Sequence, residues 1–157
     1  MSNYLVVKDK VQRFAKEVFN QVLIDDDGDL VIPYESTRVF ISVGQKDVSA
    51  DVLDFYNEYQ LSHISVEVWA PVVVDVKPSA ALFEWVARDG QDYNYGGFRV
   101  LDYGDSKNVQ LQFRVALPGD TLDPGELKDA LFAVALTADD MDDELKKRFG
   151  GKRIEDL

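Results

Sequence analysis

The stretch Leu117-Pro-Gly-Asp-Thr-Leu-Asp-Pro-Gly-Glu-Leu-Lys-Asp-Ala130 closes one element and opens the next. Asp123 can cap a helix, Pro124 suits the first helical position, and Glu126 can reach back to complete a capping box. Apolar residues then recur at helical spacing as far as Phe149, and Gly150 suits the C-cap. The sequence therefore predicts a helix of about six turns, with one apolar face. That face comprises Leu127, Leu131, Val134, Ala138, Met141 and Leu145.

Three strands are predicted before this helix. Residues 64–76 carry a strong β signal, and residues 95–103 and 109–117 form two further strands joined by the turn at residues 104–107. Pro71 lacks an N–H donor, so the first of these strands is interrupted there or lies on a sheet edge. Alternation along the strands predicts one buried face. We expect it to comprise Val66, Val68, Val72, Val74, Leu111, Phe113 and Val115.

The first half of the chain is predicted to begin with an amphipathic helix over residues 3–23. An acidic turn at residues 25–29 leads to a strand at residues 30–32, and residues 38–43 form the next strand. Residues 45–63 have the weakest secondary-structure signal in the chain. Two alternatives stay open for it, two helical turns around residues 49–56 or a long loop.

A short helix over residues 80–88, opened by Pro78-Ser79, completes the pattern. The element order is helix, three strands, helix, two strands, helix. This order predicts an α+β fold with a five-strand, mainly antiparallel sheet and with the first and last helices packed on its apolar face. Residues 1–151 are expected to form one domain, and residues 152–157 a loose C-terminal tail.

Composition excludes several classes of protein. The net charge of −12, from 29 acidic and 17 basic residues, disfavours nucleic acid and anionic membranes as partners. No apolar run approaches the roughly 20 residues that span a bilayer, and the N-terminus lacks the pattern of a signal peptide. The chain has no cysteine, which excludes disulfides and thiolate metal sites and is consistent with the cytoplasm.

No motif indicates catalysis, a metal or a cofactor. An EF-hand with its glycine at Gly28 would need carboxylates where Leu23 and Tyr34 stand, so the acidic loop is interpreted as a turn. His63 is the only histidine, and a lone imidazole is interpreted as ordinary surface. We therefore favour a non-enzymatic binding module. The alternative is a small carboxylate-dependent enzyme or small-molecule binder with a cleft near residues 25–29.

The strand face opposite the expected core is rich in large side chains. A face open only to water would be poorer in aromatic residues, which indicates a surface for a peptide or a protein partner. Two further readings stay open: a second copy of the chain closes a homodimer there, or the short helix at residues 80–88 covers it. The candidate binding residues are Phe40, Trp69, Val73, Leu101 and Tyr103, with Arg38 and Arg114 beside them.

The chain resembles the YbjN-like and type III secretion chaperone-like proteins, and its short sequence motifs are most similar to those of their actinobacterial branch. The similarity covers most of residues 24–151. The matching pieces are Asp27-Gly28-Asp29 with Ile32-Pro33, Ser36 to Phe40, Ala70 to Val76 with Pro78-Ser79, Leu117 to Asp123, Glu126-Leu127 with Ala130-Leu131, and Thr137 to Asp139 leading to Arg148 to Gly151.

This resemblance implies a small acidic cytoplasmic protein with a secretion-chaperone-like fold. It implies a non-enzymatic protein that binds a protein or peptide client, either as a monomer or as a homodimer. It implies no catalytic residue and no cofactor. The segment at residues 45–63 departs from the family pattern, so nothing is carried over to it.

Overall fold

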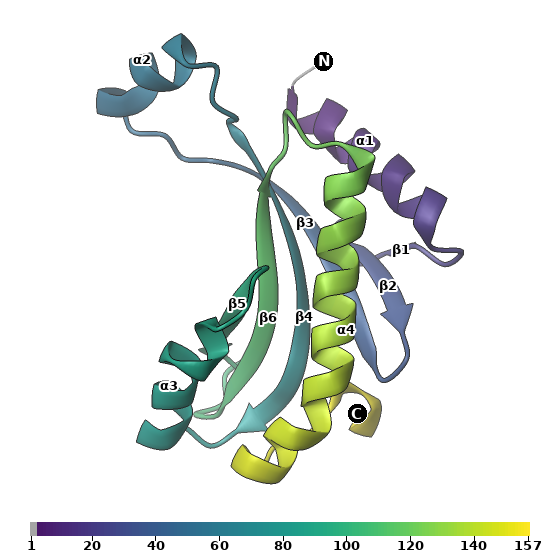
Figure 1. Cartoon of the computed structure of the whole chain (residues 1–157), viewed down its shortest axis with the longest axis vertical. Helices are drawn as coiled ribbons and strands as arrows, with labels where there is room; N and C mark the ends of the chain where they lie inside the picture. Colours follow the sequence, from purple (N-terminus) through teal and green to yellow (C-terminus); the bar gives the residue numbers. More distant parts are fainter. Residues whose placement is uncertain (1–2) are drawn as a thin grey trace.

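The computed structural model describes residues 3–157 and contains an open antiparallel sheet of six strands in the order β1-β2-β3-β4-β6-β5 (Figure 1). The strands are β1 Leu23–Ile24, β2 Leu30–Tyr34, β3 Thr37–Gln45, β4 Ile64–Val76, β5 Gly97–Asp102 and β6 Val109–Pro118. The α-helices are α1 Asn3–Val18, α2 Ala50–Glu58, α3 Ala80–Ala87 and α4 Pro124–Phe149, with short 3-10 turns η1 Asp89–Gln91 and η2 Ile154–Asp156.

Helix α4 begins where the sequence predicts. The Asp123 carboxylate accepts a hydrogen bond from the Glu126 backbone N–H at 2.8 Å, and the Glu126 carboxylate accepts one from the Asp123 N–H at 3.1 Å. This capping box satisfies two helix N–H groups that otherwise have no partner. The predicted apolar face is buried, apart from the partly buried Met141.

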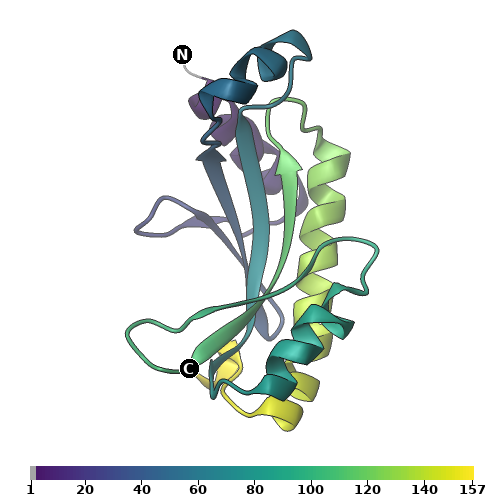
Figure 2. The same cartoon turned by 90° about the vertical axis from the view of Figure 1, so that its left-hand side faces the viewer.

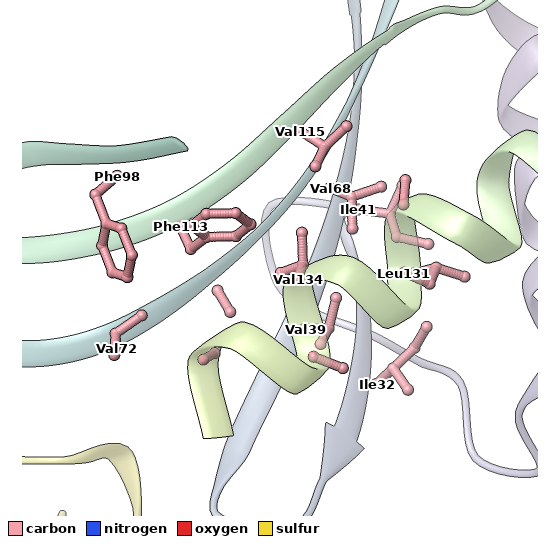
Figure 3. Packing of buried hydrophobic residues seen from close by; sticks show 14 of the residues in the cluster. Ile32, Val39, Ile41, Val68, Val72, Phe98, Phe113, Val115, Leu131 and Val134 are labelled. Carbon is pink, nitrogen blue, oxygen red and sulfur yellow. The ribbon is translucent and has the colours of Figure 1, made fainter. Parts of the chain in front are cut away.

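The core lies between α4 and one face of the sheet. Figure 3 shows Leu131 and Val134 of α4 over Ile32, Val39 and Ile41 of the neighbouring strands. Helices α1 and α3 extend the same layer, because buried residues of both belong to this cluster. Figure 2 shows α3 beside α4 on the same side of the sheet. The α+β class, the antiparallel sheet and the packing of the first and last helices are confirmed.

The sixth strand corrects the predicted five. Helix α1 ends at Val18, five residues before the predicted end, and Leu23 pairs instead with Val31 of β2. The Asp25 carboxylate accepts hydrogen bonds from the N–H groups of Asp27 and Asp29, which closes the turn of this hairpin. The two strand residues are exposed, so they carry no periodic signal that distinguishes them from a helix end.

Strand β4 is interior and irregular. It lies between β3 and β6, so the edge position considered for Pro71 is wrong and the interruption is correct. The register shifts after Pro71 and again after Val73, as expected where a proline removes a ladder hydrogen bond. The shift exchanges the sheet faces to which Val73 and Val74 point. Val73 pairs with core residue Leu111 and is buried, whereas Val74, predicted in the core face, lines the opposite face.

Residues 45–63 contain α2, so the helical alternative for this segment is correct. The helix stands away from the sheet on two connecting arms (Figure 1) and has no buried residue. Its attachment to the body includes the Tyr56 ring, which lies 5.4 Å from the ring of His63.

Residues 152–157 are docked, where the sequence predicts a loose tail. Lys152 and Val74 exchange two backbone hydrogen bonds of 2.8 Å, so the segment adds a bridge to β4. Arg153 then binds Asp156 at 2.9 Å and Asp143 of α4 at 2.6 Å. These contacts are long-range or ionic, which explains why the local pattern did not predict them.

Candidate functional site

The sheet face opposite the helices carries a pocket of about 290 Å³, called here the aromatic pocket. Four of the predicted site residues line it. Its full lining is Arg38, Phe40, Trp69, Pro71, Val74, Tyr103, Gln110, Ile154 and Leu157. These residues come from β3, β4, β6, the turn that follows β5 and the docked tail. The pocket therefore depends on strand pairing between segments far apart in the sequence.

The floor of the pocket is a stacked aromatic pair. Phe40 and Trp69 are cross-strand partners in β3 and β4, and their ring centroids lie 4.3 Å apart with an interplanar angle of 11°. Both side chains are only partly buried. An aromatic pair at directly opposed positions is a favourable cross-strand contact and presents a flat apolar surface.

A hydrogen-bond relay orients the indole. The Trp69 Nε1–H donates to the Ser42 hydroxyl at 3.0 Å, and that hydroxyl donates to the Asp29 carboxylate at 2.7 Å. Because the indole nitrogen is satisfied inside the protein, a ligand over the ring need not offer an acceptor for it. The acidic turn thus supports the pocket through Asp29.

Two carboxylates of the acidic turn, those of Asp25 and Asp29, already have structural partners. Asp25 accepts hydrogen bonds from the turn's own backbone, and Asp29 accepts one from Ser42. Within residues 3–157, no group of three or more His, Cys, Asp or Glu side chains is placed to hold a metal ion. The turn interpretation of residues 25–29 agrees with this geometry.

Charged and amide side chains border the aromatic pair. Glu67 forms ion pairs with Arg114 at 3.4 Å and with Arg99 at 3.5 Å, and burial lowers the pKa of the Arg99 guanidinium. Arg99 also donates to the Gln112 side-chain carbonyl at 2.9 Å. Arg38 is exposed and, within the described residues, forms no ion pair. The pocket therefore has a cation available on an otherwise acidic protein.

The other three predicted residues take different positions. Arg114 lies opposite Trp69 in the register and points to the same face, with Glu67 as its partner. Leu101 is on this face in β5 but does not line the pocket. Val73 is a correction, because the register shift after Pro71 turns it into the core, where its side chain is 0% exposed.

Sequence reasoning missed the residues that complete the site. Nothing in the sequence predicts that Ser42 and Asp29 support the Trp69 indole, because their contact requires the β2–β3 pairing. Val74 is brought in by the irregular register, and Ile154 and Leu157 by the docked tail. The proline at position 71 was the one available signal that the alternation would change.

Helix α3 does not cover this face. Leu82, Trp85 and Val86 of α3 are buried in the core cluster on the other side of the sheet, and Trp85 packs edge-on against Phe98. The interpretation in which the short helix shields the aromatic side chains is therefore wrong. Among the described residues, the tail is the segment that lines the pocket from outside the sheet.

An open antiparallel sheet that carries helices on one face and an aromatic pocket on the other defines a binding platform. The family model described as "T3SS (YopN, CesT) and YbjN peptide-binding chaperone 1" matches residues 6–157. The chain belongs to this family, and its role is that of a peptide-binding, chaperone-like protein. No curated protein matches the sequence.

A solved structure with a similar fold is the Yersinia pestis type III secretion chaperone SycH, in complex with a stable fragment of YscM2. The TM-score is 0.49 and the sequence identity 10%, and the match covers 85% of this chain and 98% of the chaperone chain. No helix within residues 3–157 has the length and apolar character needed to cross a membrane.

Proposed function

We propose that the aromatic pocket is the peptide-binding site of this protein. The observation that carries the proposal is the stacked Phe40–Trp69 pair, which is partly exposed on the sheet face that bears no α-helix. A peptide platform needs apolar area on a rigid support, and the Ser42–Asp29 relay supplies that rigidity for the indole. Arg38 adds a cation that can bind a carboxylate or a carbonyl group of the client.

The proposal includes a non-enzymatic role in the cytoplasm. Peptide binding needs no nucleophile, and the acidic turn that suggested a carboxylate enzyme uses Asp25 and Asp29 to build the hairpin and the pocket. A chain without cysteine is consistent with a reducing compartment. The proposal also assigns the protein to the actinobacterial branch of the family, and the sequence pieces that resemble that branch support this assignment.

Peptide binding can be tested on an array of immobilised peptides with varied aliphatic, aromatic and acidic content, followed by fluorescence anisotropy with the strongest binder. Removing a large aromatic side chain from a buried contact costs about 1.5–3 kcal/mol, so Trp69→Ala should raise Kd roughly tenfold or more. Phe83→Ala on α3 is the matched control, because Phe83 is exposed on the opposite side of the sheet. Equal Kd values for Trp69→Ala and wild type would remove the pocket from consideration.

Ser42→Ala tests the relay in the same assay. It leaves the aromatic surface intact but removes the hydrogen bond that orients the indole, an interaction worth about 0.5–1.5 kcal/mol. We expect a smaller increase in Kd than for Trp69→Ala. Ser49→Ala makes the same chemical change at an exposed position whose hydroxyl caps nothing.

We also propose that the protein forms a homodimer, through α2 and not through the aromatic face. The apolar stripe of α2 comprises Val52 and Phe55 and continues to the C-cap residue Tyr59, all exposed, while Asp51, Asp54 and Glu58 follow the adjoining stripe. A helix of nine residues has little stability in water without tertiary packing. Two copies that join their apolar stripes would supply that packing and leave the acidic stripes in solvent.

A further inference from the structure

The aromatic pocket is partly filled by the chain's own residues. Ile154 and Leu157 line it, and both belong to the turn η2 or follow it directly. A 3-10 helix has three residues per turn, so side chains three positions apart lie on the same side. The tail therefore presents an aliphatic pair, Ile-x-x-Leu, to the stacked rings of the sheet.

Two glycines direct the tail onto this face. Gly150 and Gly151 follow α4 with φ of +79° and +85°, a conformation that side chains rarely adopt. A Cβ on Gly151 would lie 2.5 Å from the carbonyl oxygen of Val74. The chain thus turns back tightly alongside β4, and the antiparallel bridge between Lys152 and Val74 fixes the start of the tail.

Beyond Lys152 the tail is held mainly by ion pairs, in which the side chains of Arg153 and Asp156 are each 23% exposed. Asp156 binds Arg153 at 2.9 Å and Lys146 of α4 at 2.8 Å, and Arg153 binds Asp143 at 2.6 Å. The partners on α4 are more exposed, and ion pairs that reach solvent contribute modest net stability and are screened by salt. Leu157 is 71% exposed even in the docked tail. The segment is anchored at one end and weakly held at the other, which suits reversible release.

We propose that residues 153–157 are a built-in pseudo-ligand that covers the aromatic pocket and gives way to client segments presenting two aliphatic side chains three residues apart. The inference rests on the proposed function, because it assigns the pocket to peptide binding. A tethered segment acts at a high effective concentration, so it lowers the apparent affinity for weak clients and selects those that fit better than the tail.

Whether residues 153–157 cover the aromatic pocket can be tested by fluorescence in the absence of a client peptide. The chain has two tryptophans, so a Trp85→Phe background leaves Trp69 as the sole indole reporter. In that background Ile154→Ser/Leu157→Ser should increase acrylamide quenching of Trp69 and shift its emission to longer wavelength. The control is Leu23→Ser/Ile24→Ser, the same chemical change at two exposed residues of β1. Circular dichroism verifies that every variant is folded.

The ligand class is tested with a fluorescein-labelled peptide of residues 152–157, Lys-Arg-Ile-Glu-Asp-Leu. Without the competing tail, Ile154→Ser/Leu157→Ser should bind it about tenfold or more tightly than wild type does. A peptide with serine at both aliphatic positions should not bind. If Ile154→Ser/Leu157→Ser leaves the quenching of Trp69 unchanged, the tail does not cover the pocket. If the variant and wild type bind the peptide equally, the tail does not compete as a pseudo-ligand. Neither result alters the Trp69→Ala array experiment, which tests the proposed function separately.

Discussion

The Ser42 hydroxyl connects the aromatic pocket with the acidic turn at residues 25–29. It accepts from the indole of Trp69 and donates to Asp29, so an acidic turn that resembles a metal loop serves as an indole support. A single hydroxyl can do this because it is both donor and acceptor. At this scale the function of a residue is set by its neighbour across the sheet and not by its neighbours in sequence.

Asp156 gives the docked tail a pH dependence with a defined sign. Its hydrogen bonds with Arg153 and then with Lys146 lower the pKa of the carboxyl group below its ordinary value of 3.8. The hydrogen bond with Asn108, followed by that with Lys152, lowers the pKa of Asp75 in the same way. The ionised Asp156 therefore favours docking, as does Asp75 through its contact with Lys152, and this contribution is lost on acidification.

In the Trp85→Phe background, quenching of Trp69 should therefore stay constant from neutral pH down to about 3.8 and rise only below it. Asp143 and Glu155 also form ion pairs with Arg153, at 2.6 and 2.7 Å. Asp156→Asn should show raised quenching already at neutral pH. The interpretation fails if this variant matches wild type across the whole range, with circular dichroism reporting folding at each pH.

At the scale of elements, α4 organises the core. Its capping box sets its start, and its buried face contacts β3, β4 and β6. The same helix carries Lys146 and Asp143, which form ion pairs with Asp156 and Arg153 of the tail. One element thus contributes to the core and also holds the tail residues that line the pocket.

Leu131→Ala should lower the free energy of unfolding by about 2–5 kcal/mol, because it leaves a cavity at a position that is 0% exposed. The matched control is Leu136→Ala on the same helix, where the side chain is 49% exposed and a change within about 0.5 kcal/mol is expected. Urea denaturation of both variants measures the difference. Similar losses for the two would mean that α4 buries a different face.

At the scale of the whole molecule, α2 is the element least accounted for by this chain alone. Figure 1 shows it apart from the sheet, and the rings of Phe55 and Tyr59 contact each other at 4.6 Å while remaining exposed. Grouped apolar side chains on a projecting helix favour a partner surface. The two proposals therefore use separate surfaces, the aromatic pocket for peptides and α2 for self-association.

Light scattering on wild type and Phe55→Ser tests this division. We expect a dimer mass for wild type and a monomer mass for the variant, because Phe55 is 55% exposed at the centre of the apolar stripe. Phe83→Ser changes an exposed phenylalanine of α3 and should leave the dimer intact. A monomeric wild type would remove α2 as an interface, and the anisotropy assay should report peptide binding by Phe55→Ser whatever its mass.

The sequence by itself determined the elements with strong local signals. The capping box at Asp123, the apolar period of α4 and the alternation along β6 depend on near neighbours, so the α+β class and the core face were predictable. The aromatic face was predictable in part, because strict alternation places Phe40 and Trp69 on one side. These predictions share one physical basis, the geometry of a single helix or strand.

Only the tertiary structure decided the register of β4, the position of β1 and the docking of the tail. A proline breaks the alternation at Pro71, but the displaced side chains, Val73 and Val74, follow from pairing with β6. The contact between Ile154 and the pocket requires α4, two glycines and β4 to be in place together. Such contacts join residues that are distant in the chain, and no local pattern encodes their free energy.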